Sequence, residues 1–316
     1  MVVVLAGGVG AARMLRGLSD AADPTTLTAI VNTGDDTVMH GLHISPDLDT
    51  VTYTLAGAID PERGWGLVDE SWRAMESLAR YTPVRPSTSG AGSTWFNLGD
   101  RDLATHLYRT ARLDEGATLT EVTAEIGRAW GLPQTLLPMT DSAVRTKVRV
   151  DGSWIDFQDY FVGRRHAVAI DAVRFDGIES AQPTPAVLAA VNDADTIVVA
   201  PSNPLVSIGP LLALPGIRPL LESRRERVVA VSPIIAGAAL KGPADRMLAE
   251  LGMEPTVVGV ARLYAPFCGT LVIDEQDAAN AAEIRELGMR CVVTDTIMRT
   301  QEVSAALGRT TLEAVG

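Results

Sequence analysis

The sequence opens with Val2-Val3-Val4-Leu5-Ala6-Gly7-Gly8-Val9-Gly10-Ala11-Ala12-Arg13, and this stretch decides the fold. A short β-branched apolar run that passes through glycines into helical spacing predicts a strand, a tight loop and a helix in succession. The run is too short to cross a membrane, and no basic segment precedes it as in a signal peptide. We therefore expect the first βα unit of an α/β protein.

The same pattern recurs further along the chain. Short apolar runs that end in turn residues are predicted as strands, and they are Thr26–Val31, Thr196–Ala200, Arg227–Val231, Thr256–Val260, Leu271–Asp274 and Arg290–Thr294. Continuous apolar strands that alternate with helices are typical of a parallel sheet buried on both faces. The predicted fold is therefore α/β, with a doubly wound, mostly parallel, Rossmann-like sheet.

The middle of the chain has a different pattern. Helical spacing predicts helices over Val68–Arg80, Arg101–Arg112 and Leu119–Trp130, whereas Thr146–Phe157 alternates like a strand pair around Asp151-Gly152. Pro83–Ser93 is rich in Pro, Ser and Gly, and we expect a mobile loop there. We predict that residues 1–59 and 160–316 form a nucleotide-binding core and that residues 60–159 form a mainly helical insertion.

Composition limits the partners of the protein. The 316 residues carry a formal charge of −12, which argues against a nucleic-acid binder, because phosphate backbones are bound by clustered Lys and Arg. A phosphorylated ligand would need a bound cation, backbone amides or a few placed arginines to offset that charge. The two cysteines have no paired spacing, so we expect neither a disulfide framework nor a zinc cluster. No apolar run reaches about 18 residues, so we expect a cytoplasmic protein without a membrane span.

The glycine loop is predicted to bind a phosphate group. Gly7, Gly8 and Gly10 allow the backbone to approach a phosphate, and the next helix offers free amides and the positive end of its dipole. The loop lacks the Gly-Lys-Ser/Thr of a Walker motif, and Arg13 stands where a dinucleotide fingerprint has its third glycine. Two simpler interpretations stay open: the loop could be only a tight turn, and Arg13 could be a solvated side chain.

Four acids follow the second predicted strand within fifteen residues. Asp35 and Asp36 end the strand, and Asp47 and Asp49 stand two residues apart in Ser45-Pro46-Asp47-Leu48-Asp49-Thr50. Capping of turns and helices could account for one or two of them. Oxygen ligands of this kind suit Mg²⁺, which favours positions that bridge phosphates. We therefore predict a Mg²⁺ site formed by these four acids, with Asp35 and Asp36 also acting in catalysis.

Further candidates lie at other predicted loops. Asn97, Asp100, Arg101 and His106 fall in a segment that we interpret as a turn with Asp100 as a helix N-cap, although a lone histidine in a helix is more often structural. Ser202, Asn203, Ser207 and Ser232 lie in proline-stiffened loops after core strands. Such loops suit recognition of a base or a sugar, but each could be an ordinary connection.

Taken together, these motifs resemble one known family. The segments GGVGAAR, NTGDD, HGLHISPDLDT, NLGDRDLATH, LPMTD, FQDYFV, PSNPLVSIGP and SPIIAG occur in order from Val2 to about Met298, and they are similar to those of the 2-phospho-L-lactate transferase (CofD) family. That family makes the deazaflavin coenzyme F-420, and its members are α/β-folded, metal-dependent and typically homodimeric. The resemblance therefore implies a Mg²⁺-dependent transferase and a homodimer.

The resemblance also implies the substrates. A lactyl- or enolpyruvyl-diphosphoguanosine would be the donor, and the terminal ribityl hydroxyl of the deazaflavin Fo would attack the phosphorus that bears the three-carbon acid, with GMP leaving. Donor binding is assigned to Gly7, Gly8, Gly10, Arg13, Ser202, Asn203, Ser207 and Ser232. Acceptor binding is assigned to Asn32, His40, Asn97, Asp100, Arg101 and His106, in part from the predicted insertion.

Two other classes of protein share a glycine loop of this kind after the first strand. A nicotinamide dehydrogenase would carry the third glycine and a single acid after the second strand, and Arg13 and the Asp35-Asp36 pair argue against it. A non-catalytic nucleotide-sugar binder, like the gluconeogenesis-factor-like proteins, would carry DDGGSSG-like and PPGD-like stretches, which are not found here. No residue in the sequence distinguishes lactate, enolpyruvate and glycerate as the acid carried.

Overall fold

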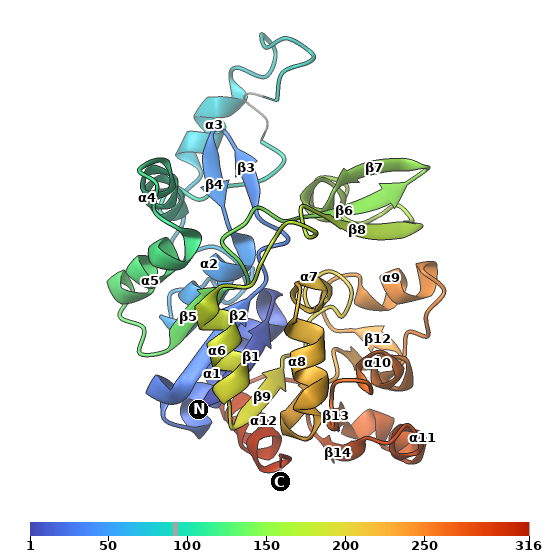
Figure 1. Ribbon diagram of the computed structural model, residues 1–316. Helices are drawn as coiled ribbons and strands as arrows, with labels where there is room; N and C mark the ends of the chain where they lie inside the picture. Colours follow the sequence, from blue (N-terminus) through green and yellow to red (C-terminus); the bar gives the residue numbers. More distant parts are fainter. Residues whose placement is uncertain (91–93, 316) are drawn as a thin grey trace.

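The computed structural model describes residues 1–90 and 94–315, and its centre is a seven-stranded parallel sheet with helices on both faces (Figure 1). The strand order is β14-β13-β10-β9-β1-β2-β5, so the first strand of the chain lies inside the sheet. The strands are β1 (Val2–Ala6), β2 (Leu27–Val31), β5 (Thr135–Pro138), β9 (Thr196–Val199), β10 (Val228–Val231), β13 (Thr270–Asp274) and β14 (Arg290–Thr294). This sheet confirms the predicted doubly wound α/β fold.

Alternate side chains of each strand enter two separate hydrophobic cores. Val4 and Val198 face the core under α1 (Gly8–Ala21), α2 (Pro46–Leu55) and α12 (Gln301–Glu313). Leu5 and Val199 face the opposite core. The helices on that side are α6 (Pro185–Asp193), α7 (Gly209–Ala213), α8 (Ile217–Ser223), α10 (Val257–Tyr264) and α11 (Ala281–Glu286). Burial on both faces explains why the strands are apolar throughout instead of alternating.

One predicted strand is a helix. The segment Thr256–Val260 forms the start of α10, whose first residue is Val257. The Thr256 side chain accepts a hydrogen bond from the amide of Gly259 at 3.1 Å and so caps the helix. A short run with three valines fits a buried strand or a buried helix equally well, and the threonine that precedes it is a typical helix cap.

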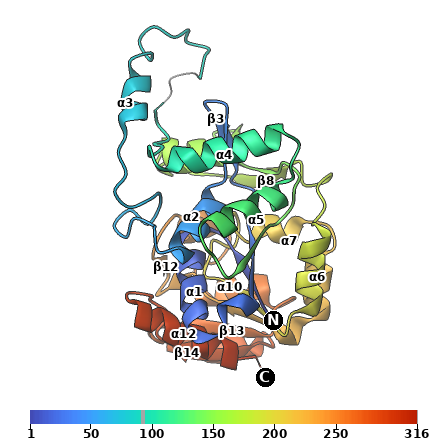
Figure 2. The ribbon, with the colours of Figure 1, turned by 90° about the vertical axis from the view of Figure 1, so that its left-hand side faces the viewer.

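The middle of the chain stands above the carboxyl ends of the strands (Figures 1 and 2). It contains the hairpin β3 (Thr37–Met39) and β4 (Leu42–Ile44) and the helices α3 (Arg73–Ala79), α4 (Asp102–Asp114) and α5 (Leu119–Ala129). The predicted strand pair is confirmed as β6 (Arg145–Val150) and β7 (Ser153–Asp156), and β8 (Ala172–Asp176) completes a three-stranded antiparallel sheet. Of the predicted loop Pro83–Ser93, residues 91–93 lie outside the described residues.

The sheets do not follow the predicted boundaries of the insertion. β5 lies within residues 60–159 but pairs with β2 at the edge of the central sheet. β8 lies beyond residue 160 but pairs with β6. The segment inserted between strands of the central sheet is therefore split by β5 into a helical part and a small β-sheet.

The starts of α3 and α4 are capped reciprocally: a side chain that precedes α4 caps α3, and a side chain that precedes α3 caps α4. Asp100, predicted to cap the helix that follows it, instead accepts hydrogen bonds from the amides of Arg73 and Ala74 at 3.1 and 3.0 Å. Glu70 in turn accepts from the amides of Arg101 and Asp102 at 2.8 and 2.9 Å. The predicted helix over Val68–Arg80 is therefore shorter than expected and begins only at Arg73, because the residues before it, including Glu70, take part in this reciprocal capping.

The remaining elements are short. They are η1 (Pro24–Thr26), η2 (Asp159–Gly163), η3 (Arg225–Arg227), β11 (Ile234–Ile235), β12 (Ala238–Ala239), α9 (Ala244–Glu250) and η4 (Glu275–Asn280). The loop between β12 and α9 comes close to the glycine loop, since Lys241 and Val9 both lie beside Gly64. No helix within the described residues is long and apolar enough to span a membrane.

Candidate functional site

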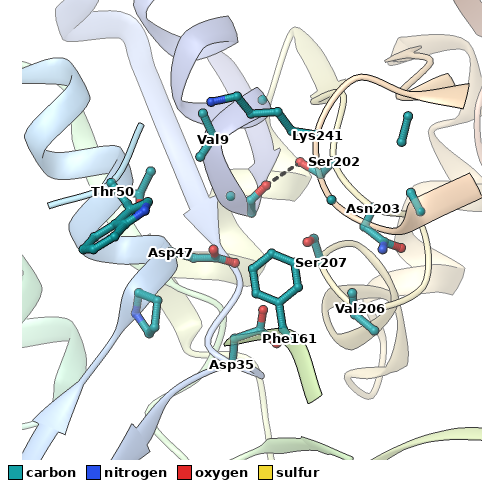
Figure 3. Close-up of a pocket in the computed structure, with 18 of the residues that line it drawn as sticks. Val9, Asp35, Asp47, Thr50, Phe161, Ser202, Asn203, Val206, Ser207 and Lys241 are labelled. Atoms are coloured by element: carbon teal, nitrogen blue, oxygen red, sulfur yellow. Dashed lines mark hydrogen bonds between the residues drawn. The ribbon is translucent and has the colours of Figure 1, made fainter. Parts of the chain in front are cut away.

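A cavity of about 840 Å³ opens at the carboxyl ends of the central strands (Figure 3). Its floor is the glycine loop after β1, and its walls come from the loops after β2, β9, β10 and β14. The middle of the chain covers it with residues from segments 63–66, 95–106 and 157–165. Ligands of open parallel sheets bind at this edge, and in this molecule the cavity lies where the chain reverses between β1 and β9.

The glycine loop has no space for side chains at Gly7 and Gly10, whereas Gly8 has a positive φ of 75°. A Cβ on Gly7 would lie 2.7 Å from Ser207 Cβ and 2.9 Å from Asp47 Oδ2, and one on Gly10 would lie 2.4 Å from the carbonyl oxygen of Pro201. Ser202 fixes the loop by donating a hydrogen bond to the carbonyl of Gly7 at 2.8 Å. The first turn of α1 contains no acid and Gly7 forms no side-chain cap, so apart from the amide of Gly8, which contacts Asp47, its amides are open to an anion.

Asp35 and Asp47 face this loop across the cavity (Figure 3). Asn32, predicted to bind the acceptor, lies behind them and positions Asp47 by donating a hydrogen bond to its Oδ2 at 2.9 Å. Burial raises the pKa of Asp35 well above its usual range, and the charges of Asp47 and Asp36 add to the rise. Burial also raises the pKa of Asp47 to about 6, against the opposing hydrogen bonds from Asn32 and Gly8.

Asp36 points to the other side of the strand end. It accepts a hydrogen bond from Ser45 at 2.7 Å and does not line the large cavity. Burial is the first cause that raises its pKa well above the usual range. One oxygen of Asp36 and one of Asp35 are buried without a hydrogen-bond partner. Such unsatisfied carboxylate oxygens are rare in folded proteins, and a proton, an ordered water or a cation would satisfy them.

Asp49 belongs to a different group of charges. Arg109 donates from Nη1 to Asp49 Oδ2 at 3.1 Å and from Nη2 to Oδ1, and both side chains are buried. His106 Nδ1 lies 3.6 Å from Asp49 Oδ2, and its Nε2 lies 3.3 Å from Asp102 Oδ2. Tyr53 donates to the other oxygen of Asp102 at 2.6 Å.

Among the described residues, Asp49, Asp102 and His106 are the acids and histidine whose potential ligand atoms lie within 4.8 Å of one another. The four acids predicted to bind a metal do not converge in this way. Because Arg109 already neutralises Asp49, an ion-paired network that joins α2 to α4 is the simpler interpretation of this group. Asp35 and Asp47 are then the predicted metal ligands that face the cavity without a cationic partner.

The predicted acceptor residues divide into two groups. Asn97 and His106 line the cavity, whereas His40, Asp100 and Arg101 do not. His40 lies in the turn of the β3–β4 hairpin with a φ of 54°. Arg101 donates to the carbonyl of Val68 at 2.7 Å. Polar spacing along the sequence did not show that the side chains of residues 100 and 101 are used in local structure.

Aromatic side chains, which the sequence reasoning missed, form much of the cover over the cavity. They are Tyr53, Trp65, Trp95, Phe96, Phe157 and Phe161. Trp65 and Trp95 are 42% and 40% exposed, which is unusual for side chains that bury so much apolar area on folding. The chain has only five tryptophans, and three of them, Trp65, Trp72 and Trp95, fall within a stretch of about thirty residues after the acidic segment, which was a signal available in the sequence.

The predicted donor residues all line the cavity. Gly7, Gly8, Gly10, Arg13, Ser202, Asn203, Ser207 and Ser232 come together from three loops. Asn203 and Ser232 use part of their hydrogen-bonding capacity to shape their own turns, since Asn203 Oδ1 accepts from the amide of Leu205 at 2.9 Å and Ser232 Oγ donates to the carbonyl of Ile234 at 2.9 Å. The wall also includes Thr296–Arg299 after β14 and the segment 239–244, neither of which was predicted.

Comparison with known proteins identifies the family to which this site belongs. The family model described as 2-phospho-L-lactate transferase CofD matches residues 2–311. The chain belongs to the CofD family. Membership makes it a transferase of coenzyme F-420 biosynthesis, as the motifs implied.

Named relatives of this CofD-family chain match it over nearly its whole length. It is 44% identical over 319 residues to a phosphoenolpyruvate transferase of Streptomyces griseus, covering 99% of this chain and 97% of that protein. It is 41% identical over 336 residues to a phosphoenolpyruvate transferase of Mycobacterium avium, covering 97% of each. A solved protein of the UPF0052 family from Bacillus halodurans is similar in fold, with a TM-score of 0.61, 16% identity and 98% coverage of both chains.

Proposed function

We propose that this transferase moves a phosphoenolpyruvyl group from enolpyruvyl-diphosphoguanosine to the terminal ribityl hydroxyl of Fo and releases GMP, giving dehydro coenzyme F-420-0. The observation that carries the proposal is the placement of Asp35 and Asp47 opposite the glycine loop in one cavity at the switch point of the sheet. The names of the relatives favour enolpyruvate over lactate. The proposal includes a homodimer in the cytoplasm.

The residues present fit a Mg²⁺ ion. Asp35 and Asp47 offer hard oxygen ligands in a buried position, and Asp35 Oδ1 has no hydrogen-bond partner. Two neighbouring carboxylates with raised pKa values repel one another unless a proton or a cation intervenes. We propose that these two acids would hold Mg²⁺, which would neutralise charge on the diphosphate when bound.

The chain's own residues supply positioning. The amides of the glycine loop and of the α1 N-terminus would hold the diphosphate, while Ser202 keeps the loop in place. The aromatic cover, including Trp65 and Trp95, offers flat apolar surfaces for a tricyclic deazaflavin. Closure of these groups over the cavity would also keep water from competing with the acceptor hydroxyl.

The proposed reaction is an in-line displacement at phosphorus. The ribityl oxygen forms a bond to the phosphorus that carries the three-carbon acid, and the bond from that phosphorus to the bridging oxygen of GMP breaks. The hydroxyl proton passes to one of the carboxylates that face the cavity. GMP leaves with the electron pair of the broken bond.

Mass spectrometry of Fo tests the proposal. The purified protein is incubated with Fo, Mg²⁺ and, in separate reactions, the enolpyruvyl, lactyl or glyceryl diphosphoguanosine donor. We expect the mass of the phosphoenolpyruvyl adduct and an equal amount of GMP with the first donor, and no effect of added NAD. No mass gain on Fo with any of the three donors would contradict the transferase assignment to these substrates.

A further inference from the structure

Three cations of the cavity, Arg13, Arg165 and Lys241, have no acidic partner within the described residues, and Arg13 and Lys241 lie close together. Arg13 stands in the first half of α1, and Lys241 stands in the loop between β12 and α9. The side chain of neither is paired with an acid in the part of the chain that the structure describes. Burial lowers the pKa of Lys241, and the charge of Arg13 lowers it further, so the two cations are close enough to repel each other. Like charges held together in a cavity are stable when an anion lies between them.

Lys241 is an exposed residue whose ammonium group lies beside Gly64 and Val9. A Cβ built on Gly64 would lie 3.0 Å from Lys241 Nζ and 3.5 Å from Val9 Cγ1, so the ammonium group lies over residues 9 and 64 (Figure 3). Residues 9 and 13 are one helical turn apart and share a face of α1. Lys241 therefore approaches the same face of the helix from which Arg13 projects.

Asp47 approaches the glycine loop at a different point from the two cations. Asp47 lies 2.9 Å from the Cβ position of Gly7 and 4.0 Å from that of Gly8. An anion that extends along the loop therefore meets the Asp47 carboxylate near Gly7 and Gly8, and the cations Lys241 and Arg13 on the face of α1 that carries Val9. This polarity is useful for a ligand with two different anionic parts.

The proposed donor has two such parts. Its diphosphate carries two negative charges and its three-carbon acid carries a third, on a carboxylate. A divalent cation at the acids together with the loop amides would serve the diphosphate. The carboxylate then remains to be neutralised, and an ammonium group and a guanidinium group are its usual partners in proteins.

Two of the other cations that line the cavity are already occupied. Arg63 is paired with Asp60 at 3.0 Å and lies over the rings of Trp65 and Trp72. Arg299 is paired with Asp295 at 3.0 Å. Arg165, the third cation without an acidic partner among the described residues, stands in the segment after η2, where its backbone amide donates to the carbonyl of Val162 at 3.4 Å.

We propose that Arg13 and Lys241 form the binding site for the carboxylate of the three-carbon acid of the donor, and that they make the enzyme specific for an acidic donor over plain guanosine diphosphate. The proposal rests on the proposed function. It goes beyond the proposed function because it assigns residues to the carboxylate end of the donor, which the glycine loop and the acids do not contact.

Binding measurements with two nucleotides test this assignment. Titration calorimetry compares GDP with lactyl-diphosphoguanosine, which carries the same carboxylate on a saturated acid, for the wild type, Lys241→Met and Arg13→Met. We expect each substitution to weaken binding of lactyl-diphosphoguanosine by about tenfold and to change binding of GDP by less than about twofold. With the methyl ester of the lactyl donor, the wild type and both variants are expected to bind equally well.

The chain offers a matched control, because Lys147 is its one other lysine. Lys147 is paired with Asp156 at 2.7 Å on β6 and does not line the cavity, so Lys147→Met is expected to leave both affinities unchanged. Equal losses for GDP and the lactyl donor in Lys241→Met would place the lysine on a phosphate and overturn the proposal. Unchanged affinities in both variants would also overturn it. A wild type that binds neither nucleotide would contradict the proposed function itself.

Discussion

Arg109 and Asp49 form a buried, two-point ion pair between α4 and the first turn of α2. Asp47 lies in the same helical turn as Asp49 and faces the cavity. The ion pair therefore fixes the part of α2 that carries an acid of the site. It also joins the middle of the chain to the central sheet, because α4 belongs to the former and α2 packs on α1.

Removal of Arg109 is expected to destabilise the protein strongly. Arg109→Met leaves the Asp49 carboxylate buried without its cation, which costs about 3–5 kcal/mol of unfolding free energy. Urea denaturation measures the loss. The double variant Arg109→Met with Asp49→Asn removes the unpaired charge and is expected to recover part of it. A single variant within about 1 kcal/mol of wild type would show that the pair does not hold α2.

The raised pKa of Asp47 predicts how stability without metal depends on pH. A carboxyl group whose pKa is higher in the folded state contributes stability below its unfolded pKa of about 3.9 and loses it as pH rises through about 6. Asp47→Asn removes this dependence. In the presence of a metal chelator, we expect the free energy of unfolding of the variant, relative to wild type, to rise by about 2–3 kcal/mol between pH 4 and pH 7. A stability difference that does not change with pH would contradict the shift.

Asp35→Asn is expected to abolish transfer while the protein stays folded. The substitution keeps the size of the side chain but removes a proton acceptor and a hard ligand, so the rate of Fo conversion should fall at least about a hundredfold. Thermal unfolding should be unchanged or higher, since a buried charge is lost. Asp151→Asn, in the β6–β7 turn, is the control with full activity. Near wild-type turnover in Asp35→Asn would remove Asp35 from the mechanism.

Trp65→Ala is expected to weaken binding of the acceptor. Stacking of a planar ring on an aromatic side chain contributes about 1–3 kcal/mol, so the KM for Fo should rise by about ten- to a hundredfold with little change in the affinity for GDP. Steady-state kinetics with varied Fo measures the effect. Trp154→Ala is the matched control, because Trp154 lies between Arg149 and Arg174 on the three-stranded sheet and does not line the cavity. An unchanged KM in Trp65→Ala would place the deazaflavin elsewhere.

Gly17→Ala tests the packing of α1 on α12. A Cβ on Gly17 would lie 2.2 Å from the carbonyl oxygen of Ser304, so the helices must separate, and we expect a loss of about 1–3 kcal/mol in unfolding free energy. Gly127→Ala in α5 is the control, since nothing lies within 4 Å of its Cβ position. That change should stabilise the protein by about 0.5–1 kcal/mol. Similar melting temperatures for the two variants would contradict this account.

Much of the fold could be predicted because local patterns and tertiary burial agree. β1, β9 and β10 are apolar runs followed by turn residues, and each pairs as a parallel strand in the core. β5 was missed because Thr135–Pro138 is short, lies at the sheet edge and contains a proline, which usually argues against a strand. Edge position is a tertiary property that no local window of sequence contains.

Site residues could be predicted where a polar or small residue directly follows a strand. They could not be predicted where the partner of the side chain lies far away in the sequence. Asp35 and the glycines could be predicted because they are polar or small residues at the ends of predicted strands. Asp100 looked equally suitable, but its carboxylate caps a helix that begins 27 residues earlier in the chain. Lys241 could not be predicted from the sequence. It comes close to the glycine loop only through the tertiary fold, because its loop lies more than 200 residues after β1 in the chain.

The interior position of β1 has a consequence for biosynthesis. β1 pairs with β2 on one edge and with β9 on the other, and β9 begins only at Thr196. During translation the first strand therefore keeps an apolar, unpaired edge until nearly two thirds of the protein has left the ribosome, and such an edge invites pairing with other nascent chains. The strand that carries the glycine loop is thus also the one whose protection from aggregation has to wait for the C-terminal half.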